Sequence, residues 1–260
     1  MATTLTGPVQ IYGQDIFTAS NIPQHALGER GVTAEGRSFR YCSIEPSATT
    51  VTGQVAGATL IAGNLIQTSA PVANHLALTP SVANIGDLTV TVTLGATAAY
   101  ANQYSQGAIL VSVAPGLGQL LKIRSHPAAA ASATLVLTLE DPIIVALSAS
   151  SRIDLMRNIY AGVIQAPATT TGAILGSAQF AIPALTTGGA LGQNYGWIQT
   201  KGPAAVLSAA TIAANIPITG TISAGTAGAV IAASGILQTI GVTLVATASG
   251  RTSAVYLMID

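Results

Sequence analysis

The segment Leu88-Thr89-Val90-Thr91-Val92-Thr93-Leu94 constrains the fold of this chain more than any other stretch. Aliphatic residues alternate with threonines along its whole length, so an extended strand would have one apolar face and one polar face. A helix would instead spread these aliphatic side chains around its circumference. Because β-branched residues also favour strands, the segment predicts a half-buried β-strand.

Further segments show the same alternation and are separated by glycine and proline: residues 37–44, 107–113, 119–126 and 134–139. In residues 119–126, Leu121 and Ile123 are expected to face the core and His126 to face the solvent. Regular short strands between turn residues predict an all-β fold. We expect a β-sandwich or jelly-roll domain over residues 37–157.

The composition changes near residue 158. Between Asn158 and Ile259 the only charged residues are Lys201 and Arg251, and short strand candidates alternate with glycine and proline. Small residues such as alanine and glycine allow strands to bend tightly and to pack closely. We therefore predict a second domain over residues 158–260, a small barrel-like β-structure rich in alanine and glycine.

Residues 1–36 contain several prolines and glycines and show no sustained periodicity. This pattern predicts an extended N-terminal arm rather than a domain. Two interpretations are open. Short apolar pieces such as Val9–Tyr12 and Ile16–Phe17 would add to the sheet edge of a neighbouring subunit, or the segment is a partly disordered tail.

The only tryptophan, Trp197, lies in a segment that also contains Tyr195. We predict a strand from Tyr195 to Thr200 that ends before Gly202 and Pro203, because proline cannot donate a ladder hydrogen bond. Tyr195 and Trp197 fall on one face of this strand. In a chain with 4% aromatic residues, they form either a core anchor around which strands pack or an exposed platform for a sugar or a partner.

Charged residues make up 7% of the chain, against roughly 25% in ordinary soluble proteins, and nine bases balance nine acids. A neutral chain has no basic patch for nucleic acid or for an acidic lipid surface. No apolar run reaches the ~18 to 20 residues that a membrane span requires. So few charges protect a monomer poorly against association, and we expect much of the surface to be covered by other subunits.

Four arginines near acidic residues are candidate interface groups: Arg37, Arg40, Arg152 and Arg157. Arginine suits these roles because its planar guanidinium pairs with a carboxylate through two parallel hydrogen bonds. The alternative is local pairing within the chain, for which Glu35, Glu45 and Asp154 are the nearest carboxylates.

The sequence contains no recognisable catalytic or metal-binding constellation. The three histidines, His25, His75 and His126, lie in separate segments without a second ligand at metal-binding spacing. No G-x-S-x-G elbow for a nucleophilic serine occurs. The single cysteine, Cys42, cannot form an internal disulfide and is expected in the core. We therefore expect no enzymatic activity, cofactor or metal.

Residues 195–207 (Tyr-Gly-Trp-Ile-Gln-Thr-Lys-Gly-Pro-Ala-Ala-Val-Leu), the short strands after them and the endings 240–244 and 251–259 resemble the C-terminal part of structural proteins of tailed bacteriophages. Similar chains decorate or cement the head. This resemblance implies a virion protein on the capsid exterior, made in the host cytoplasm, that contacts the major capsid protein and forms a homotrimer. The alternative is a receptor- or glycan-binding fibre or tail component, with Tyr195 and Trp197 as its platform.

Overall fold

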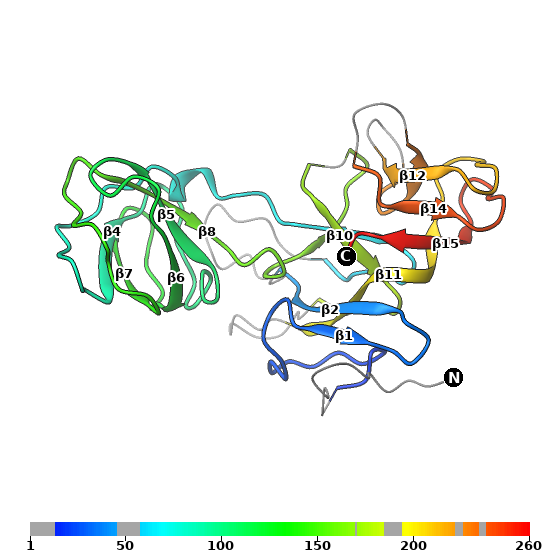
Figure 1. Cartoon of the computed structure of the whole chain (residues 1–260), viewed down its shortest axis with the longest axis horizontal. Helices are drawn as coiled ribbons and strands as arrows, with labels where there is room; N and C mark the ends of the chain where they lie inside the picture. The colour runs from blue at the N-terminus through cyan, green and yellow to red at the C-terminus, as the bar shows by residue number, and fades with distance from the viewer. Residues whose placement is uncertain (1–13, 46–57, 170, 185–193, 222–225, 234–237) are drawn as a thin grey trace. The chain divides into compact units, whose positions relative to one another are not determined.

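The computed structural model describes residues 14–45, 58–169, 171–184, 194–221, 226–233 and 238–260 (Figure 1). Within these ranges the chain forms fifteen β-strands and one short 3-10 helix, Ala73–His75. The predicted all-β fold is confirmed. None of the described residues form a helix long and apolar enough to span a membrane. Val9–Tyr12 of the predicted arm lies outside the described residues.

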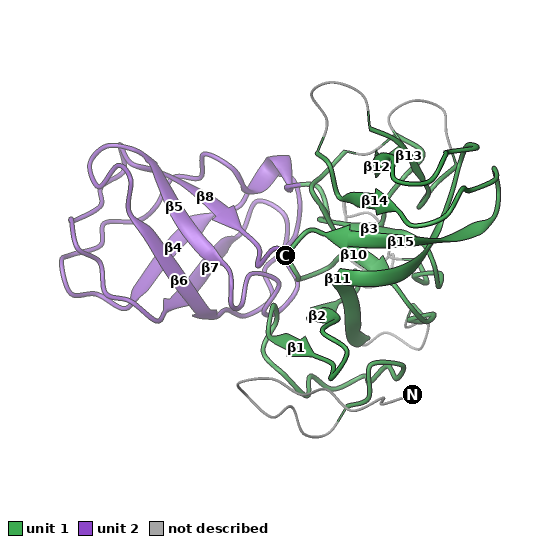
Figure 2. Cartoon of the chain, turned by 45° about the vertical axis from the view of Figure 1, so that its right-hand side comes forward, with its two compact units in different colours: residues 1–47, 56–70, 160–260 green, residues 48–55, 71–159 purple. Residues whose placement is uncertain are grey.

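The chain folds into two compact units (Figure 2). Described residues within 1–47, 56–70 and 160–260 form unit 1, and residues 71–159 form unit 2. This division differs from the predicted one, which placed residues 37–157 in one domain and residues 158–260 in the next. Residues 38–43 belong to unit 1 because they pair with a strand from the C-terminal half, and composition does not register such distant pairing. The predicted boundary near residue 158 lies beside Tyr160, where the chain returns to unit 1.

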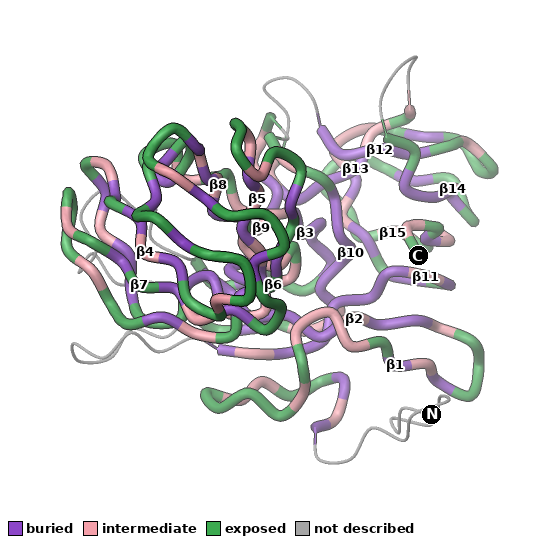
Figure 3. Tube along the Cα trace, turned by 60° about the vertical axis from the view of Figure 1, so that its left-hand side comes forward, coloured by how far each residue is buried: buried purple, intermediate pink, exposed green. Residues whose placement is uncertain are grey.

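Unit 2 contains a five-stranded antiparallel sheet in the order β4-β7-β6-β5-β8. Its strands are β4 (Thr89–Thr93), β5 (Ala108–Val113), β6 (Leu120–Ser125), β7 (Thr134–Leu139) and β8 (Arg152–Met156). Val90 and Val92 of β4 lie opposite Leu137 and Leu135 of β7, and all four side chains are buried in one core. Buried and exposed residues alternate along β4 and β7 (Figure 3), as the sequence pattern predicts.

A short segment before β4 joins the two edges of this sheet. Leu78 exchanges two backbone hydrogen bonds of 2.9 Å with Ile153 of β8, and the Ser81 N–H donates to the Thr91 carbonyl of β4 at 2.8 Å. Since β4 and β8 are the edge strands of the sheet, residues 78–81 close it on itself. Unit 2 is therefore barrel-like, and its edge strands are covered by its own chain.

The expectation that His126 faces the solvent is wrong. His126 is 4% exposed. The register between β6 and β7 shifts between Ile123 and Ser125, and such a bulge inserts one residue into the alternation of faces. The side chain at position 126 consequently turns into the interior instead of following Lys122 and Arg124 outward.

Unit 1 contains a ten-stranded sheet with the path β13-β12-β14-β15-β11-β10-β3-β9, and β2 pairs with both β1 and β11. The strands are β1 (Arg30–Val32), β2 (Ser38–Ser43), β3 (Leu65–Gln67), β9 (Ile164–Gln165), β10 (Ile174–Ala178), β11 (Tyr195–Leu207), β12 (Pro217–Gly220), β13 (Val230–Ala232), β14 (Gly241–Thr243) and β15 (Thr252–Met258). Strands from both ends of the chain meet on β11, which organises the unit.

Strand β11 continues to Leu207, past its predicted end at Gly202 and Pro203. Its first half pairs with β2 and its second half pairs with β15, where Pro203 lies opposite Tyr256. Gly202 has a φ of +92°, which glycine adopts without the steric penalty of a side chain. The strand therefore bends at Gly202 and exchanges partners there instead of ending.

The described part of the predicted N-terminal arm is an integral part of unit 1. The side chain of Ile16 is fully buried, and Ser20 exchanges backbone hydrogen bonds of 3.0 and 2.8 Å with Tyr195. Strand β1 pairs with β2. Residues 14–36 thus extend the sheet of their own chain. The backbone N–H and C=O groups that pair in this sheet are not available for pairing with a neighbouring subunit.

Candidate functional site

Trp197 lies in the core of unit 1, where it anchors an aromatic cluster. Its side chain is 0% exposed, and its ring centroid lies 5.0 Å from that of Tyr41 and 5.1 Å from that of His25. Tyr195 is half-buried and stacks on Tyr41 with the centroids 6.1 Å apart. The rings meet because β2 and β11 place Trp197 directly opposite Tyr41. This is the arrangement of a core anchor, and it leaves Trp197 unable to serve as an exposed platform.

The phenol groups of this cluster and the neighbouring thiol of Cys42 stay protonated at neutral pH. The Tyr41 hydroxyl donates to the side-chain oxygen of Gln14 at 2.7 Å and accepts the Gln24 N–H at 3.1 Å. Burial raises the pKa of Tyr41 and of Tyr195, so both phenols stay protonated at neutral pH. Burial likewise raises the pKa of the Cys42 thiol to about 12, which leaves no thiolate to act as a nucleophile.

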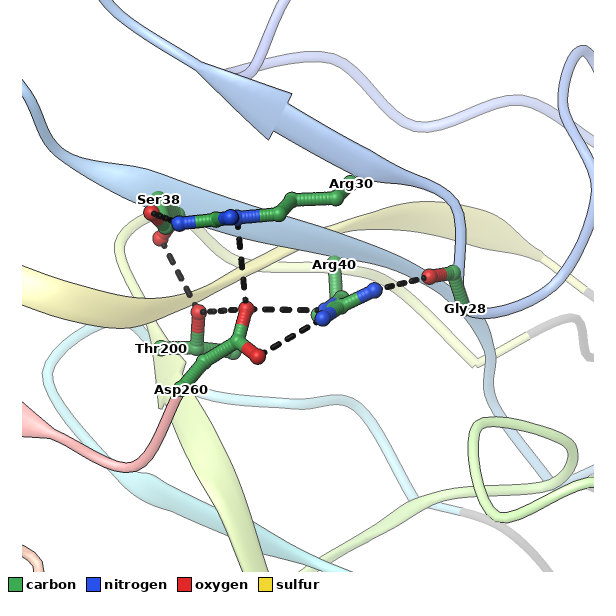
Figure 4. Close-up of polar contacts among 6 residues, drawn as sticks. All are labelled: Gly28, Arg30, Ser38, Arg40, Thr200 and Asp260. Carbon is green, nitrogen blue, oxygen red and sulfur yellow. Dashed lines mark hydrogen bonds and ion pairs between the residues drawn. The ribbon is translucent and has the colours of Figure 1, made fainter.

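A polar cluster connects β1, β2 and the segment after β15 (Figure 4). Arg40 donates from Nε to Asp260 Oδ2 at 2.9 Å and from Nη2 to Oδ1 at 2.6 Å, while its Nη1 donates to the Gly28 carbonyl at 2.9 Å. Arg30 Nε lies 3.6 Å from Asp260 Oδ2. The Thr200 hydroxyl lies 3.4 Å from the same oxygen.

The electrostatics of this cluster indicate a structural role, in which Arg40 and Asp260 join distant segments of unit 1. We call this pair the Arg40–Asp260 tie. The hydrogen bonds from Arg40 lower the pKa of Asp260, and the carboxylate in turn raises the pKa of Arg40. Each carboxylate oxygen already accepts a charge-assisted hydrogen bond, and Arg40 uses three donors inside unit 1. Arg40 therefore holds parts of its own chain together instead of presenting its guanidinium to a partner.

The other three candidate arginines also have contacts within their own units. Arg37 lies 3.6 Å from Glu35, the local pairing that was the alternative for this residue. Arg152 donates to the backbone carbonyls of residues 149 and 151 at 2.9 and 2.7 Å. The guanidinium of Arg157 lies 6.0 Å from the ring centroid of Tyr104. Arg37 and Arg40 thus belong to unit 1 and Arg152 and Arg157 to unit 2, and each has contacts within its own unit.

Two histidines flank Tyr104 in the interior of unit 2. His75 Nε2 lies 2.9 Å from the Thr97 carbonyl, so this nitrogen carries the proton and Nδ1 accepts the hydrogen bond from the Tyr104 hydroxyl. His126 Nε2 accepts the Tyr104 N–H at 3.0 Å. Burial lowers the pKa of both histidines. All three side chains are nearly inaccessible to solvent. The hydrogen bonds therefore hold segments of the core of unit 2 together, and a substrate could not reach these groups.

Among the described residues, no group of three or more potential ligands lies close enough together to hold a metal ion. Comparisons with protein-family models, with curated proteins and with solved structures find no match. The geometry of the chain is therefore the basis for any functional assignment.

Reasoning from the sequence missed two features: the ion pair between Arg40 and Asp260, and a group of exposed aliphatic residues. Asp260 has no local pattern that marks it, because its partner Arg40 is 220 residues away in the chain. The second feature is a set of exposed aliphatic residues in loops of unit 2. No periodicity distinguishes such residues from core residues, since both are aliphatic.

Proposed function

We propose that this chain is a structural virion protein of a tailed bacteriophage, which decorates and stabilises the exterior of the capsid. In this role it binds the major capsid protein and associates with copies of itself, in a homotrimer. The resemblance of residues 195–207 and 251–259 to phage head proteins supports the assignment. The role is mechanical and involves no catalysis and no nucleic acid.

The observation that carries this proposal is the scarcity and the placement of charge. Charged residues are 7% of the chain, and several of them pair within the described units: Arg30 and Arg40 with Asp260, Arg37 with Glu35, and Lys122 with Glu140. A β-rich surface with so little free charge has little protection against association. Contacts with copies of the chain and with a capsid would cover that surface.

The alternative function, a receptor- or glycan-binding fibre component, has less support. An aromatic side chain that stacks on a sugar has to be accessible, and Trp197 is 0% exposed. Tyr195 alone is half-buried and stacked on Tyr41. The pair therefore does not offer the surface on which the alternative depends.

The test is to purify phage particles from a lysate that produces the chain and to locate it on them. We expect the chain to sediment with filled heads, in a fixed ratio to the major capsid protein, and antibodies against it to label the outside of intact heads. Removing it should lower the temperature at which heads rupture. Recovery of the chain only in the soluble fraction, or labelling confined to tails, would overturn the proposal.

A further inference from the structure

One end of the barrel-like unit 2 is built from three loops that are bonded to one another. The loops, with the strand residues that border them, are residues 82–88 before β4, residues 113–120 from the last residue of β5 to the first residue of β6, and residues 142–147 in the connection after β7. Ala83 and Leu147 exchange backbone hydrogen bonds of 3.2 and 2.8 Å, and the Gly86 N–H donates to the Ile143 carbonyl at 2.8 Å. The first and third loops are thus paired like short strands.

The buried side chain of Gln119 connects the second loop to the third. Its Oε1 accepts the N–H groups of Ile144 at 2.9 Å and Val145 at 3.0 Å, and its Nε2 donates to the Val145 carbonyl at 3.0 Å. A primary amide suits this position because it accepts and donates at the same time. The three loops therefore form one preorganised frame, and a surface on it loses little conformational freedom on binding.

This frame carries aliphatic side chains outward. The three ranges hold eight exposed aliphatic residues. Leaving out Leu88, which borders β4, and Val113, which ends β5, each range contributes two, with exposed fractions from 46% at Val145 to 73% at Val82. We call this surface the aliphatic rim; it consists of Val82, Ile85, Leu117, Leu120, Ile144 and Val145. One third of the eighteen exposed large hydrophobic residues in the described chain lie in it, so the exposure is concentrated rather than scattered.

The six side chains of the rim are uncharged, and few charged residues lie beside them in the chain. Within the three ranges Asp87 is the only charged residue, and its carboxylate accepts the N–H of Asn84 within its own turn at 2.7 Å. Glu140 and Asp141 directly precede the third range, where Glu140 pairs with Lys122 at 3.0 Å. The loops contain no aromatic residue, lysine or arginine. Surfaces for sugars use exposed aromatic rings, membrane-interface segments use Trp, Tyr and basic residues, and nucleic acid requires basic residues. The chemistry of the rim fits another aliphatic protein surface.

We propose that the aliphatic rim is the surface through which the copies of the proposed homotrimer associate, so that its occupants are the rims of the other two copies around the three-fold axis. A symmetric contact places equivalent residues close to one another. Charges of one sign would repel in such a contact, whereas an uncharged aliphatic surface is complementary to itself. The inference rests on the self-association in the proposed function and identifies the residues responsible for it.

The size of the rim fits this role. Burying a Val, Leu or Ile side chain stabilises by about 1.5–3 kcal/mol at about 25 cal/mol per Å², which corresponds to roughly 100 Å² per side chain. With six side chains that are about two-thirds exposed, the rim has on the order of 400 Å² of apolar surface. A stable interface buries about 800 Å² per partner, of which somewhat more than half is apolar. The rim thus supplies the apolar centre of such an interface.

Charge-insertion variants of the full chain test the inference. Leu117→Glu and Ile144→Glu put a carboxylate into the rim, and Val136→Glu puts the same group on the outer face of β7, where Val136 is 43% exposed. Sedimentation measures association over a range of micromolar concentrations, and circular dichroism shows whether unit 2 stays folded. We expect each rim variant to raise the dissociation constant at least roughly tenfold. Val136→Glu and the apolar exchange Leu117→Met should associate like the wild-type chain.

The result that overturns the inference is unchanged association of folded Leu117→Glu and Ile144→Glu. A wild-type chain that stays monomeric at all concentrations also overturns it, as does a rim-dependent binding of neutral phosphatidylcholine vesicles without self-association. Labelling of purified heads is measured separately. If the chain binds heads but the rim variants associate normally, the rim inference fails while the proposed function stands; if the chain is absent from heads, the proposed function fails.

Discussion

Replacing Asp260 by asparagine is expected to destabilise unit 1. The size of the effect can be estimated from the contacts of the Asp260 carboxylate. The carboxylate accepts hydrogen bonds of 2.9 and 2.6 Å from Arg40 and lies 3.6 Å from Arg30. Hydrogen bonds to charged groups contribute roughly 1.5–3 kcal/mol. Because the side chains of Arg40 and Asp260 are 25% and 23% exposed, solvent screening lowers this value, and we expect a loss of about 1–2 kcal/mol.

The same carboxylate makes the stability of unit 1 depend on pH. The hydrogen bonds from Arg40 hold the pKa of Asp260 below its ordinary value. A carboxyl with a lowered pKa in the folded state stabilises the fold above its unfolded pKa of about 3.9, and this stabilisation is lost as the pH falls through the folded value. The wild-type chain should therefore lose about 1–2 kcal/mol over this acidic range that Asp260→Asn does not lose.

Fluorescence-detected unfolding in urea measures this effect in unit 1 alone, because Trp197 is the only tryptophan of the chain and lies in that unit. Glu35→Gln is the matched control. It also removes a carboxylate that faces an arginine, at 3.6 Å, but Glu35 is 49% exposed, and the midpoint should not change. If Asp260→Asn has the same midpoint as Glu35→Gln and keeps the acid sensitivity of the wild-type chain, the tie has no energetic role and the reasoning is refuted.

Three further outcomes follow from the buried groups. Trp197→Ala should cost about 3–5 kcal/mol in unit 1, measured by circular dichroism; a loss below about 1 kcal/mol would contradict a fully buried side chain. Burial lowers the pKa of His75 and His126, so the unfolded chain binds protons more readily, and the melting temperature of unit 2 should fall as the pH drops below about 6.5; a melting temperature that is independent of pH from 7 to 5 contradicts this. Gln119→Leu should destabilise unit 2 by about 1–3 kcal/mol, because the N–H of Val145 loses its acceptor; a wild-type melting temperature would show that solvent replaces the amide.

Strands with one buried and one exposed face could be located from the sequence. The structure places β4 at Thr89–Thr93 and β7 at Thr134–Leu139, where the alternation of aliphatic residues and threonines predicts them. This succeeds because the faces of a single strand are determined by the nearest neighbours in the chain. The all-β class follows from the same local pattern repeated in several segments.

Features that depend on distant pairing or on one inserted residue could not be found in this way. Proline cannot donate a ladder hydrogen bond, so Gly202 and Pro203 predict the end of a strand, but Gly202 has a φ of +92° and β11 continues past it. A bulge between Ile123 and Ser125 turns His126 inward. The assignment of residues 38–43 to unit 1 depends on pairing with β11 across more than half of the chain. None of these events leaves a periodicity in the sequence.

The low charge of the chain predicts that its surface is covered, and the aliphatic rim is the proposed place of contact. In unit 1 the carboxylate of Asp260 is occupied by Arg40, and in unit 2 Asp87 is held by Asn84, so neither charge protects an exposed surface. The aliphatic rim lies outside these ties, on a frame that Gln119 makes rigid. A new charge at Leu117 should therefore weaken association while unit 2 stays folded, whereas a cavity at Trp197 should unfold unit 1 without a specific effect on the rim. Such independent effects on association and on folding are expected only if the rim of unit 2 mediates association and the Trp197 core stabilises unit 1.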